Sequence, residues 1–198
     1  MHTKLLTTAV AATLAGSLFL APLAHAVEYT QVQADKSSVQ FNYQQMGVKM
    51  DGRFRKFSSQ LSFDPAKPTA ARASFDIELA SVDTGSSEAD QEVAGKPWFN
   101  SAAFPVARFV SSSVKPLGNN RYEVTGKLTI KGKTQDLSFP ASFAPQGAGD
   151  KGGVVGGVFE GGFTLRRADF SIGEGSWAKF DIVANDVGIK FRIAVQGK

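Results

Sequence analysis

Along most of this chain, apolar side chains recur at every second position. Val39, Phe41 and Tyr43 alternate with polar residues. The same alternation returns over residues 75–79, 122–130, 137–143, 159–165 and 189–195. Successive side chains of a β-strand point to opposite faces, so each segment has one apolar face and one polar face. This pattern is typical of antiparallel strands with one face on a core and the other in water. It predicts an all-β meander of about eight antiparallel strands, closed into a barrel because closure removes exposed sheet edges.

Clusters of turn-forming residues separate these segments. They are Asp64-Pro65, residues 116–120, Lys131-Gly132-Lys133 and the glycine-rich residues 147–157. Gly118-Asn119-Asn120 and Gly132 are typical of hairpin turns. Within the later strands, glycine pairs at 152–153, 156–157 and 161–162 alternate with Val and Phe. We interpret these pairs as bulges or bends that let the sheet curl.

Residues 86–104 depart from the period of two. Residues 88–94 favour a helix, and Pro97 and Phe104-Pro105 bracket a second short turn. The segment predicts a crossover with one or two short helices that packs Trp98, Phe99 and Phe104 against the barrel. A crossover of this length within a compact domain is often functional. Its aromatic residues therefore either border a binding site or only fill the core.

The first 26 residues differ in composition from the rest. Lys4 is followed by an uncharged stretch rich in Ala and Leu, and Ala24-His25-Ala26 places small residues where a signal peptidase cleaves. A membrane anchor is the alternative, but Pro22 and several Thr and Ser residues interrupt the stretch and no stop-transfer charges follow. We predict a cleaved signal peptide over residues 1–26, one domain over residues 27–198, and export to the periplasm.

The residue types of thiol, metal and haem chemistry are missing from residues 27–198. The sequence has no Cys, and its two histidines are His2 and His25. The commonest general base and metal ligand are therefore absent, and no nucleophile elbow or phosphate-binding glycine loop replaces them. The net charge is +4, but basic residues alternate with acids and form no nucleic-acid-binding run. We expect no catalytic residues, no metal, no cofactor and no nucleic-acid partner.

An acidic group surrounds the predicted helix. It comprises Asp83, Glu88, Asp90 and Glu92. Two carboxylates could act as a general acid and base, but a solvated helix start is the favoured interpretation, because acids are stabilised near a helix N-terminus.

Arg166-Arg167 is the other candidate polar site. Adjacent residues of a strand face opposite sides, so one arginine would point to the barrel interior or its rim. That arginine either holds the anionic head group of a ligand or pairs with Asp169 or Asp181.

A series of short motifs runs in order along the chain. They are Ser38-Val39-Gln40-Phe41, residues 51–57, Leu61-Ser62-Phe63-Asp64, residues 81–85, 98–109, 126–132 and 167–173, and Val187-Gly188-Ile189. The ordered set resembles the YceI-like family of periplasmic polyisoprenoid-binding proteins. The resemblance implies an eight-stranded antiparallel, lipocalin-like β-barrel.

Two features refine this resemblance. Many family members carry Arg-Asp-x-His-Leu-Arg-Ser in the crossover, whereas Glu92 stands here in place of the His and only Asp90 matches. A ligand contact through that His is therefore not expected. Trp177, after Gly173-Glu174-Gly175-Ser176, is similar to a subgroup that can occur alongside cytochrome b561-type membrane proteins.

An apolar barrel without catalytic groups suits one long hydrocarbon, because each buried methylene contributes about 0.8 kcal/mol. The expected function is a periplasmic carrier of a long-chain isoprenoid or similar amphiphilic lipid. The alternatives are an accessory protein that presents a quinone-type ligand to a cytochrome b561-like partner and, disfavoured by the missing His and Cys, an enzyme acting on a lipid. The oligomeric state is left open. The expected ligand-binding residues are Phe41, Phe75, Ile77, Trp98, Phe99, Phe104, Phe109, Leu128, Phe139, Phe163, Arg167 and Phe170, with Arg166 or Arg167 as the polar anchor.

Overall fold

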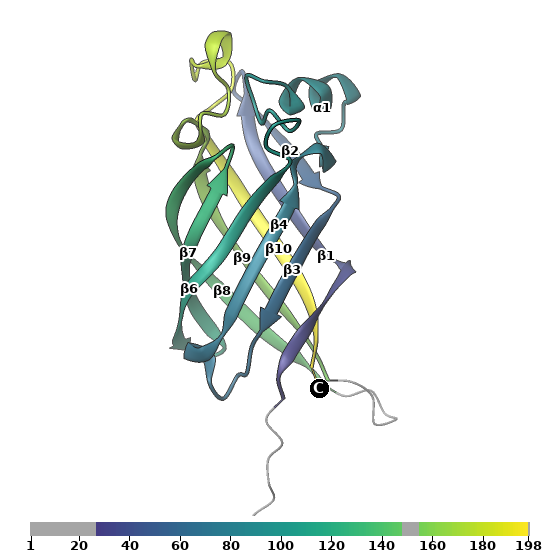
Figure 1. Cartoon of the computed structure of the whole chain (residues 1–198), viewed down its shortest axis with the longest axis vertical. Coiled ribbons are helices and arrows are strands. Elements are labelled where there is room, and N and C mark those ends of the chain that lie inside the picture. Colours follow the sequence, from purple (N-terminus) through teal and green to yellow (C-terminus); the bar gives the residue numbers. More distant parts are fainter. Residues whose placement is uncertain (1–26, 148–154, 198) are drawn as a thin grey trace, which may run out of the picture.

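An antiparallel sheet curls into a barrel in the computed structural model, which describes residues 27–147 and 155–197 (Figure 1). The predicted signal peptide lies outside the described residues. The described strands are β1 (Tyr29–Gln45), β2 (Val48–Phe54), β3 (Phe57–Ser62), β4 (Arg72–Glu78), β5 (Val82–Asp83), β6 (Val106–Gly118), β7 (Arg121–Ile130), β8 (Lys133–Gln146), β9 (Gly156–Arg166) and β10 (Asp186–Gly197). One α-helix, α1 (Ser87–Ala94), and four 3-10 turns, Pro68–Ala70, Leu79–Ser81, Arg167–Phe170 and Gly175–Trp177, complete the described elements. The prediction of an all-β, lipocalin-like barrel is confirmed.

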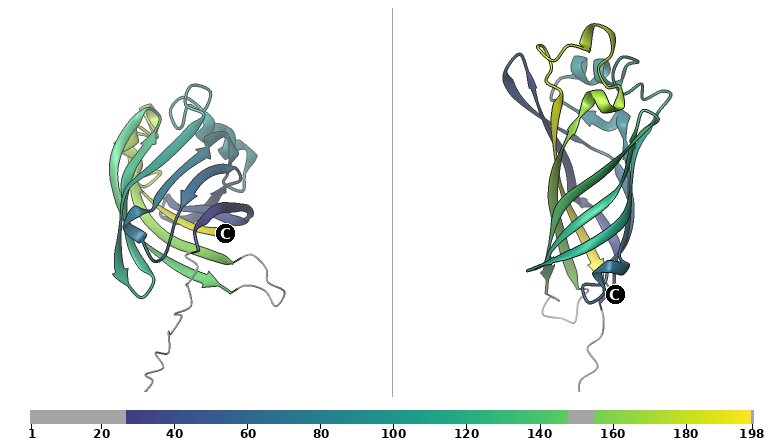
Figure 2. Two further views of the ribbon diagram at one scale, coloured as in Figure 1. Left: turned by 60° about the horizontal axis from the view of Figure 1, so that its bottom comes forward. Right: turned by 90° about the vertical axis from the view of Figure 1, so that its left-hand side faces the viewer.

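The sheet runs in the order β3-β4-β6-β7-β8-β9-β10-β1-β2-β5, and every neighbouring pair is antiparallel. Tyr29 and Phe63 exchange backbone hydrogen bonds of 2.8 and 3.0 Å, which join the start of β1 to the end of β3. At the other end, β5 pairs with β2. The views of Figure 2 show the resulting tall barrel from two further sides.

The structure has ten strands in its described part, where the sequence predicted eight. β5 is two residues long, too short to show any alternation. β2 and β3 are separate strands because the chain breaks its pairing at Arg55 and Lys56. A third missed signal is the turn between β1 and β2, where Met46 and Gly47 have φ of +49° and +79°. Asn and Gly are typical of such a turn and Met is not, so the sequence did not predict it.

The two predicted hairpin turns are confirmed. Asn119 and Asn120 have φ of +51° and +55°, and Lys131 and Gly132 have φ of +50° and +73°. Positive φ at both central positions gives a turn whose twist matches that of the flanking strands, and Asn and Gly adopt it at little cost.

The glycines of β9 are not bulges, because β9 keeps an unbroken register with β8 and β10. Gly161 instead leaves room for a ring, since a Cβ there would lie 2.5 Å from Phe191 Cζ. Phe41 lies against Gly52 of the neighbouring strand in the same way. The rings therefore rest on bare backbone inside the barrel. Gly152 and Gly153 lie outside the described residues.

The crossover and the segment after β9 meet at one end of the barrel, which we call the upper end because it lies uppermost in Figure 1. Ser86 caps α1, its hydroxyl accepting a hydrogen bond from the Ala89 N–H at 3.4 Å. The C-terminus lies at the opposite, lower end. We call residues 167–185, between β9 and β10, the upper loop. Within the described residues no helix is long and apolar enough to cross a bilayer.

Candidate functional site

Two apolar cavities occupy the barrel interior. The lower cavity has a volume of about 170 Å³ and lies among residues such as Phe63, Phe139 and Phe191. The upper cavity, of about 330 Å³, extends to the crossover and the upper loop, where Trp98 and Val183 line it. The residues that line both cavities are Val39, Ile77, Ala107, Leu128, Phe163 and Ile189. The two cavities therefore adjoin along the barrel, with this belt as their common lining.

Most of the predicted binding residues line this space. Phe75, Phe109 and Phe139 line the lower cavity, and Phe41, Trp98, Phe99 and Arg167 line the upper one. The belt between them contains Ile77, Leu128 and Phe163. The apolar faces identified from the alternation of the strands are thus brought together in the interior. Ligand contact itself stays a prediction.

Two predicted residues lie outside both linings. Phe104 packs against the hairpin turn at Gly132, whose added Cβ would lie 3.1 Å from Phe104 Cε1. Phe170 is buried in the core of the upper end. It belongs to the turn Arg167–Phe170 rather than to a strand.

Several lining residues were not among the expected ligand-binding residues. The alternation had placed Tyr43, Phe191 and Ile193 on apolar strand faces, but they were not selected for the site. Trp177 and Val183 belong to the upper loop, where no periodic pattern indicates which side chains turn inward.

The lower cavity offers almost no polar group. Among its described lining residues only Arg72 and Tyr122 carry polar side-chain atoms. Arg72 Nη1 donates to the backbone oxygens of Ala70 and Ala71 at 3.2 and 2.8 Å. Burial raises the pKa of the Tyr122 phenol, which therefore stays neutral. This cavity is suited to hydrocarbon alone.

Arg167 is fully buried at the upper end, with 1% of its surface exposed. Its predicted strand position is wrong, because β9 ends at Arg166 and Arg167 begins a 3-10 turn. The guanidinium donates to the backbone oxygens of Ile172, Gly173, Trp177, Lys179, Val183 and Ala184 at 2.7 to 3.2 Å. Burial lowers the pKa of the guanidinium. All of its N–H groups are engaged, so Arg167 organises the upper loop and has no donor left for an anion.

The alternative prediction, an ion pair with Asp169, holds for Arg166 and not for Arg167. Arg166 Nη2 lies 3.0 Å from Asp169 Oδ2 on the surface, whereas Arg167 pairs with neither Asp169 nor Asp181 among the contacts of the described residues. Neither arginine therefore presents an unused cation to the interior.

The acidic residues near α1 serve separate structural roles. Asp83 accepts hydrogen bonds from Arg53 and Arg55, and the bond from Arg53 is the main cause of its lowered pKa. Asp90 Oδ1 accepts from both the backbone N–H and the hydroxyl of Thr84 at 2.7 Å.

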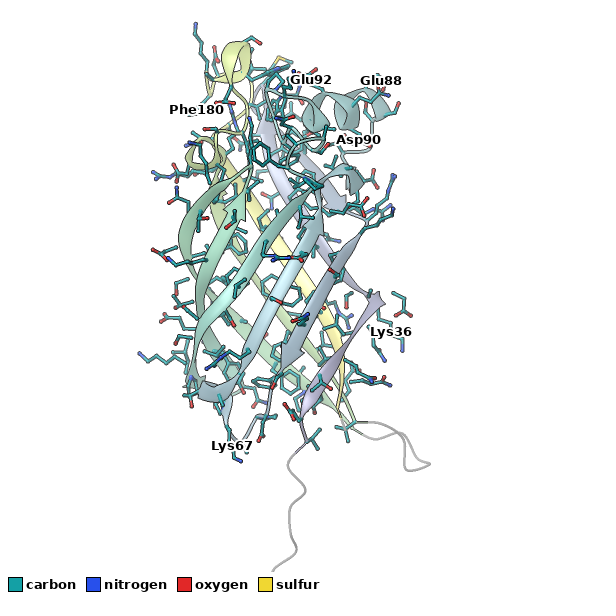
Figure 3. All side chains as sticks on the ribbon, viewed as in Figure 1. Lys36, Lys67, Glu88, Asp90, Glu92 and Phe180 are labelled. Carbon is teal, nitrogen blue, oxygen red and sulfur yellow. The ribbon has the colours of Figure 1, made fainter. Side chains whose placement is uncertain are left out.

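Glu88 lies in the first turn of α1 and accepts from the Ser86 hydroxyl at 2.8 Å. Figure 3 shows Glu88, Asp90 and Glu92 around the helix at the upper end. The described hydrogen bonds of Asp83, Glu88 and Asp90 thus go to separate partners, and Glu88 lies where an acid stabilises a helix start.

The upper cavity has a polar rim. Tyr43, Thr84 and Glu92 line it, and Glu92 Oε1 accepts a hydrogen bond from Trp177 Nε1 at 2.9 Å. Burial, with a smaller contribution from the charge of Asp90, raises the pKa of Tyr43, so its phenol stays protonated. The described lining of this rim therefore offers a neutral phenol, a hydroxyl and one carboxylate, and its arginine is engaged by backbone oxygens.

Trp98, which lines the upper cavity, has a side-chain hydrogen-bond donor without a partner in the described part of the chain. Its indole Nε1 is buried and finds no acceptor among the described residues. The corner of the ring opposite Nε1, at Cζ3, lies toward Gly173, and the ring face lies 5.4 Å from the Arg167 guanidinium. A buried donor without a partner costs about 1–3 kcal/mol.

Comparisons with known proteins agree with this architecture. The model of the YceI-like domain matches residues 30–195. A UPF0312 protein of Azotobacter vinelandii is 34% identical over 167 residues, covering 83% of this chain and 86% of the relative. One from Shewanella oneidensis is 32% identical over 187 residues, covering 93% and 94%.

Solved structures share the barrel. The crystal structure of Burkholderia cenocepacia BcnA has a TM-score of 0.77 and 41% identity, covering 83% of this chain and 99% of that one. A polyisoprenoid binding domain from Saccharophagus degradans has a TM-score of 0.64 at 15% identity, covering 87% and 99%, and shows the common fold alone. With the match to the domain model spanning nearly all of its described residues, the chain belongs to the YceI-like family.

Proposed function

We propose that this protein binds and carries a long-chain isoprenoid or a similar amphiphilic lipid inside the barrel. The observation that supports this proposal best is the apolar interior, in which the lower and upper cavities adjoin at a belt of apolar residues. Transfer of each methylene from water to such an interior contributes about 0.8 kcal/mol, so a few isoprene units give useful affinity. The domain from Saccharophagus degradans, named for polyisoprenoid binding, is built on the same fold. No catalytic step is part of this proposal.

The site supports a neutral head group over an anionic one. Arg167 is the sole cation among the described residues that line the upper cavity, and its donors are all engaged by backbone oxygens. Glu92 contributes negative charge to the same lining. The unpartnered Trp98 N–H suits a carbonyl or hydroxyl oxygen. The tail would then occupy the lower cavity and the head the upper one.

This polarity also favours a second candidate function. A quinone combines an isoprenoid tail with neutral carbonyl acceptors, as the upper cavity requires. The protein would then present a quinone-type ligand to a cytochrome b561-like membrane partner, an idea that rests on the resemblance carried by Trp177. We further propose that residues 1–26 direct the chain to the periplasm and are removed near Ala26.

Native mass spectrometry of protein purified from its own periplasm tests the carrier function. We expect a lipid adduct that organic extraction removes and whose fragmentation identifies the head group. Protein that carries no adduct and takes up neither a polyprenol nor a quinone after extraction would overturn the proposal.

A charge placed in the interior supplies the matching variant. Phe163→Asp introduces an unpaired carboxylate at the belt and should abolish lipid uptake while circular dichroism still reports a folded barrel. Val110→Asp adds the same charge at an exposed position of β6 and serves as the control that retains uptake.

A further inference from the structure

Exposed apolar side chains gather at one part of the upper rim. Seven large hydrophobic residues are exposed in the described part of the chain, and four of them lie on two adjacent segments. Met46 (72% exposed) lies in the β1–β2 turn and Val48 (61%) begins β2, whereas Phe180 (49%) and Ile182 (39%) belong to the upper loop. Figure 3 shows Phe180 at the upper end, with Lys67 at the lower one. We call these four residues the apolar lip.

The two segments are joined to each other by backbone contacts. The Met46 N–H donates to the Ile182 oxygen at 2.7 Å, and the Ala184 N–H donates to the Gln44 oxygen at 3.0 Å. Between these bonds, Gln45 and Val183 pair as an isolated bridge. The two segments that carry the apolar lip are therefore held side by side.

The apolar lip directly adjoins the upper cavity. Gln45 and Val183 line that cavity, and the next residues, Met46 and Ile182, are exposed. Neighbouring residues of the chain therefore line the interior and form the outer apolar surface. A lipid that leaves the barrel at this rim would meet apolar side chains rather than water.

The Met46 backbone points to a role for its side chain. Its φ of +49° falls in the left-handed region, which Asn or Gly adopts more readily than Met in a turn of this type. The turn at Asn119 and Asn120 shows the ordinary solution elsewhere in the same barrel. Met46 in this conformation therefore lowers the stability of the turn. Its side chain gains nothing from burial in return, because it is 72% exposed.

We propose that the apolar lip docks on the surface of a phospholipid bilayer and inserts its side chains among the lipids. Exposed Lys49 and Lys179 flank the lip, with Asp181 as the single acid within residues 179–182, so the charge at the lip suits anionic head groups. Apolar side chains with adjacent lysines are typical of surfaces that lie at a membrane interface. Docking would bring the rim of the upper cavity to the bilayer, where lipid could enter or leave. The argument for docking does not depend on which lipid the barrel holds.

Vesicle flotation tests the proposal directly. Protein purified from the periplasm of a Gram-negative host is mixed with vesicles of phosphatidylethanolamine and phosphatidylglycerol and centrifuged through a density gradient. We expect the wild type to float with these vesicles. The variant Met46→Asn/Val48→Thr should bind them at least about tenfold more weakly, because it removes the apolar side chains of the turn.

The design separates docking from folding and from lipid binding. Asn suits the left-handed position and Thr suits a strand, so this variant should keep or slightly raise the melting temperature. Leu117→Ser, at a residue that is also 49% exposed but lies beside the β6–β7 turn, is the matched control and should float like the wild type. Ile182→Thr provides an independent second variant on the upper loop, and Phe180 is left in place because its ring lies 5.1 Å from the Arg167 guanidinium.

Ligand uptake measured without vesicles should be the same in all four proteins. A wild type that never floats, or lip variants that float as well as the wild type, would overturn the docking proposal and leave the carrier function standing. Retention only by vesicles that contain membrane proteins would assign the lip to a protein partner and would overturn the proposal equally. Loss of uptake by the wild type would instead contradict the carrier function.

Discussion

Trp177 and Glu92 are 85 positions apart in the sequence, and the indole Nε1 of Trp177 donates to Glu92 Oε1 across 2.9 Å. The bond links the upper loop to α1 beside the upper cavity. Both side chains also line that cavity. The contact therefore ties the upper loop to α1 across the lining of the upper cavity.

Removal of this link should speed ligand exchange more than it lowers stability. The bond is solvent-exposed, so we expect Glu92→Ala to change the free energy of unfolding by less than about 1 kcal/mol. Lipid transfer to acceptor vesicles, followed by stopped-flow fluorescence, should become several times faster. Glu92→Gln keeps an oxygen acceptor and should exchange at nearly the wild-type rate. Equal rates in all three proteins would contradict this role.

Arg167 is expected to act on stability rather than on head-group affinity. Arg167→Gln leaves most of six backbone oxygens without their donor, and the free energy of unfolding should fall by about 3 kcal/mol or more. Urea unfolding measures this loss. Arg166→Gln is the adjacent control and should cost less than about 1 kcal/mol, because the Arg166–Asp169 ion pair is exposed. Similar losses in both variants would show that the buried guanidinium has no special role.

Trp98 should distinguish ligands by their head groups. Trp98→Phe retains an aromatic ring but removes the buried N–H, so affinity for a quinone with an isoprenoid tail should fall about tenfold. Affinity for squalene, which has no acceptor, should change by less than about threefold, since apolar burial alone holds it. Titration of both ligands by fluorescence provides the measurement. Phe99→Leu, on the same segment, should weaken both ligands alike.

Substitution of Ala107 by a large residue should make affinity depend on the length of the lipid tail. It lines both cavities, so Ala107→Phe would place a ring at the belt that joins them. A long polyprenol should then lose more than about tenfold in affinity, because its tail no longer reaches the lower cavity. Farnesol, which fits the upper cavity alone, should bind within about threefold of the wild type. An equal loss for both alcohols would indicate that the ring disturbs the fold rather than the passage.

The strand faces were predictable because burial on one side of a strand leaves a period of two in the sequence. Phe75, Phe109 and Phe139 were assigned to the interior on this basis, and they line the lower cavity. Trp98 and Phe99 were found differently, as large aromatics in the segment that breaks the period.

The upper loop was not predictable in the same way. Its conformation depends on Arg167, whose donors meet backbone oxygens, and every residue offers a backbone oxygen regardless of its side chain. The expected partners were Asp169 and Asp181 because only side-chain charges are visible in a sequence. The apolar lip escaped notice for a related reason, since Met46 and Ile182 meet only through the folded backbone.

The aromatic rings that pack against glycine help to set the width of the barrel interior. Phe191 lines the lower cavity. Its ring packs directly against the backbone of Gly161, which has no side chain to hold the ring away from the barrel wall. A methyl group at Gly161 would lie 2.5 Å from Phe191 Cζ and 2.7 Å from the Pro140 backbone oxygen, so both the ring and the neighbouring strand would have to shift, although residue 161 itself lines neither cavity. The choice of ligand in such a barrel is therefore set partly from behind its lining, by positions that no ligand contacts.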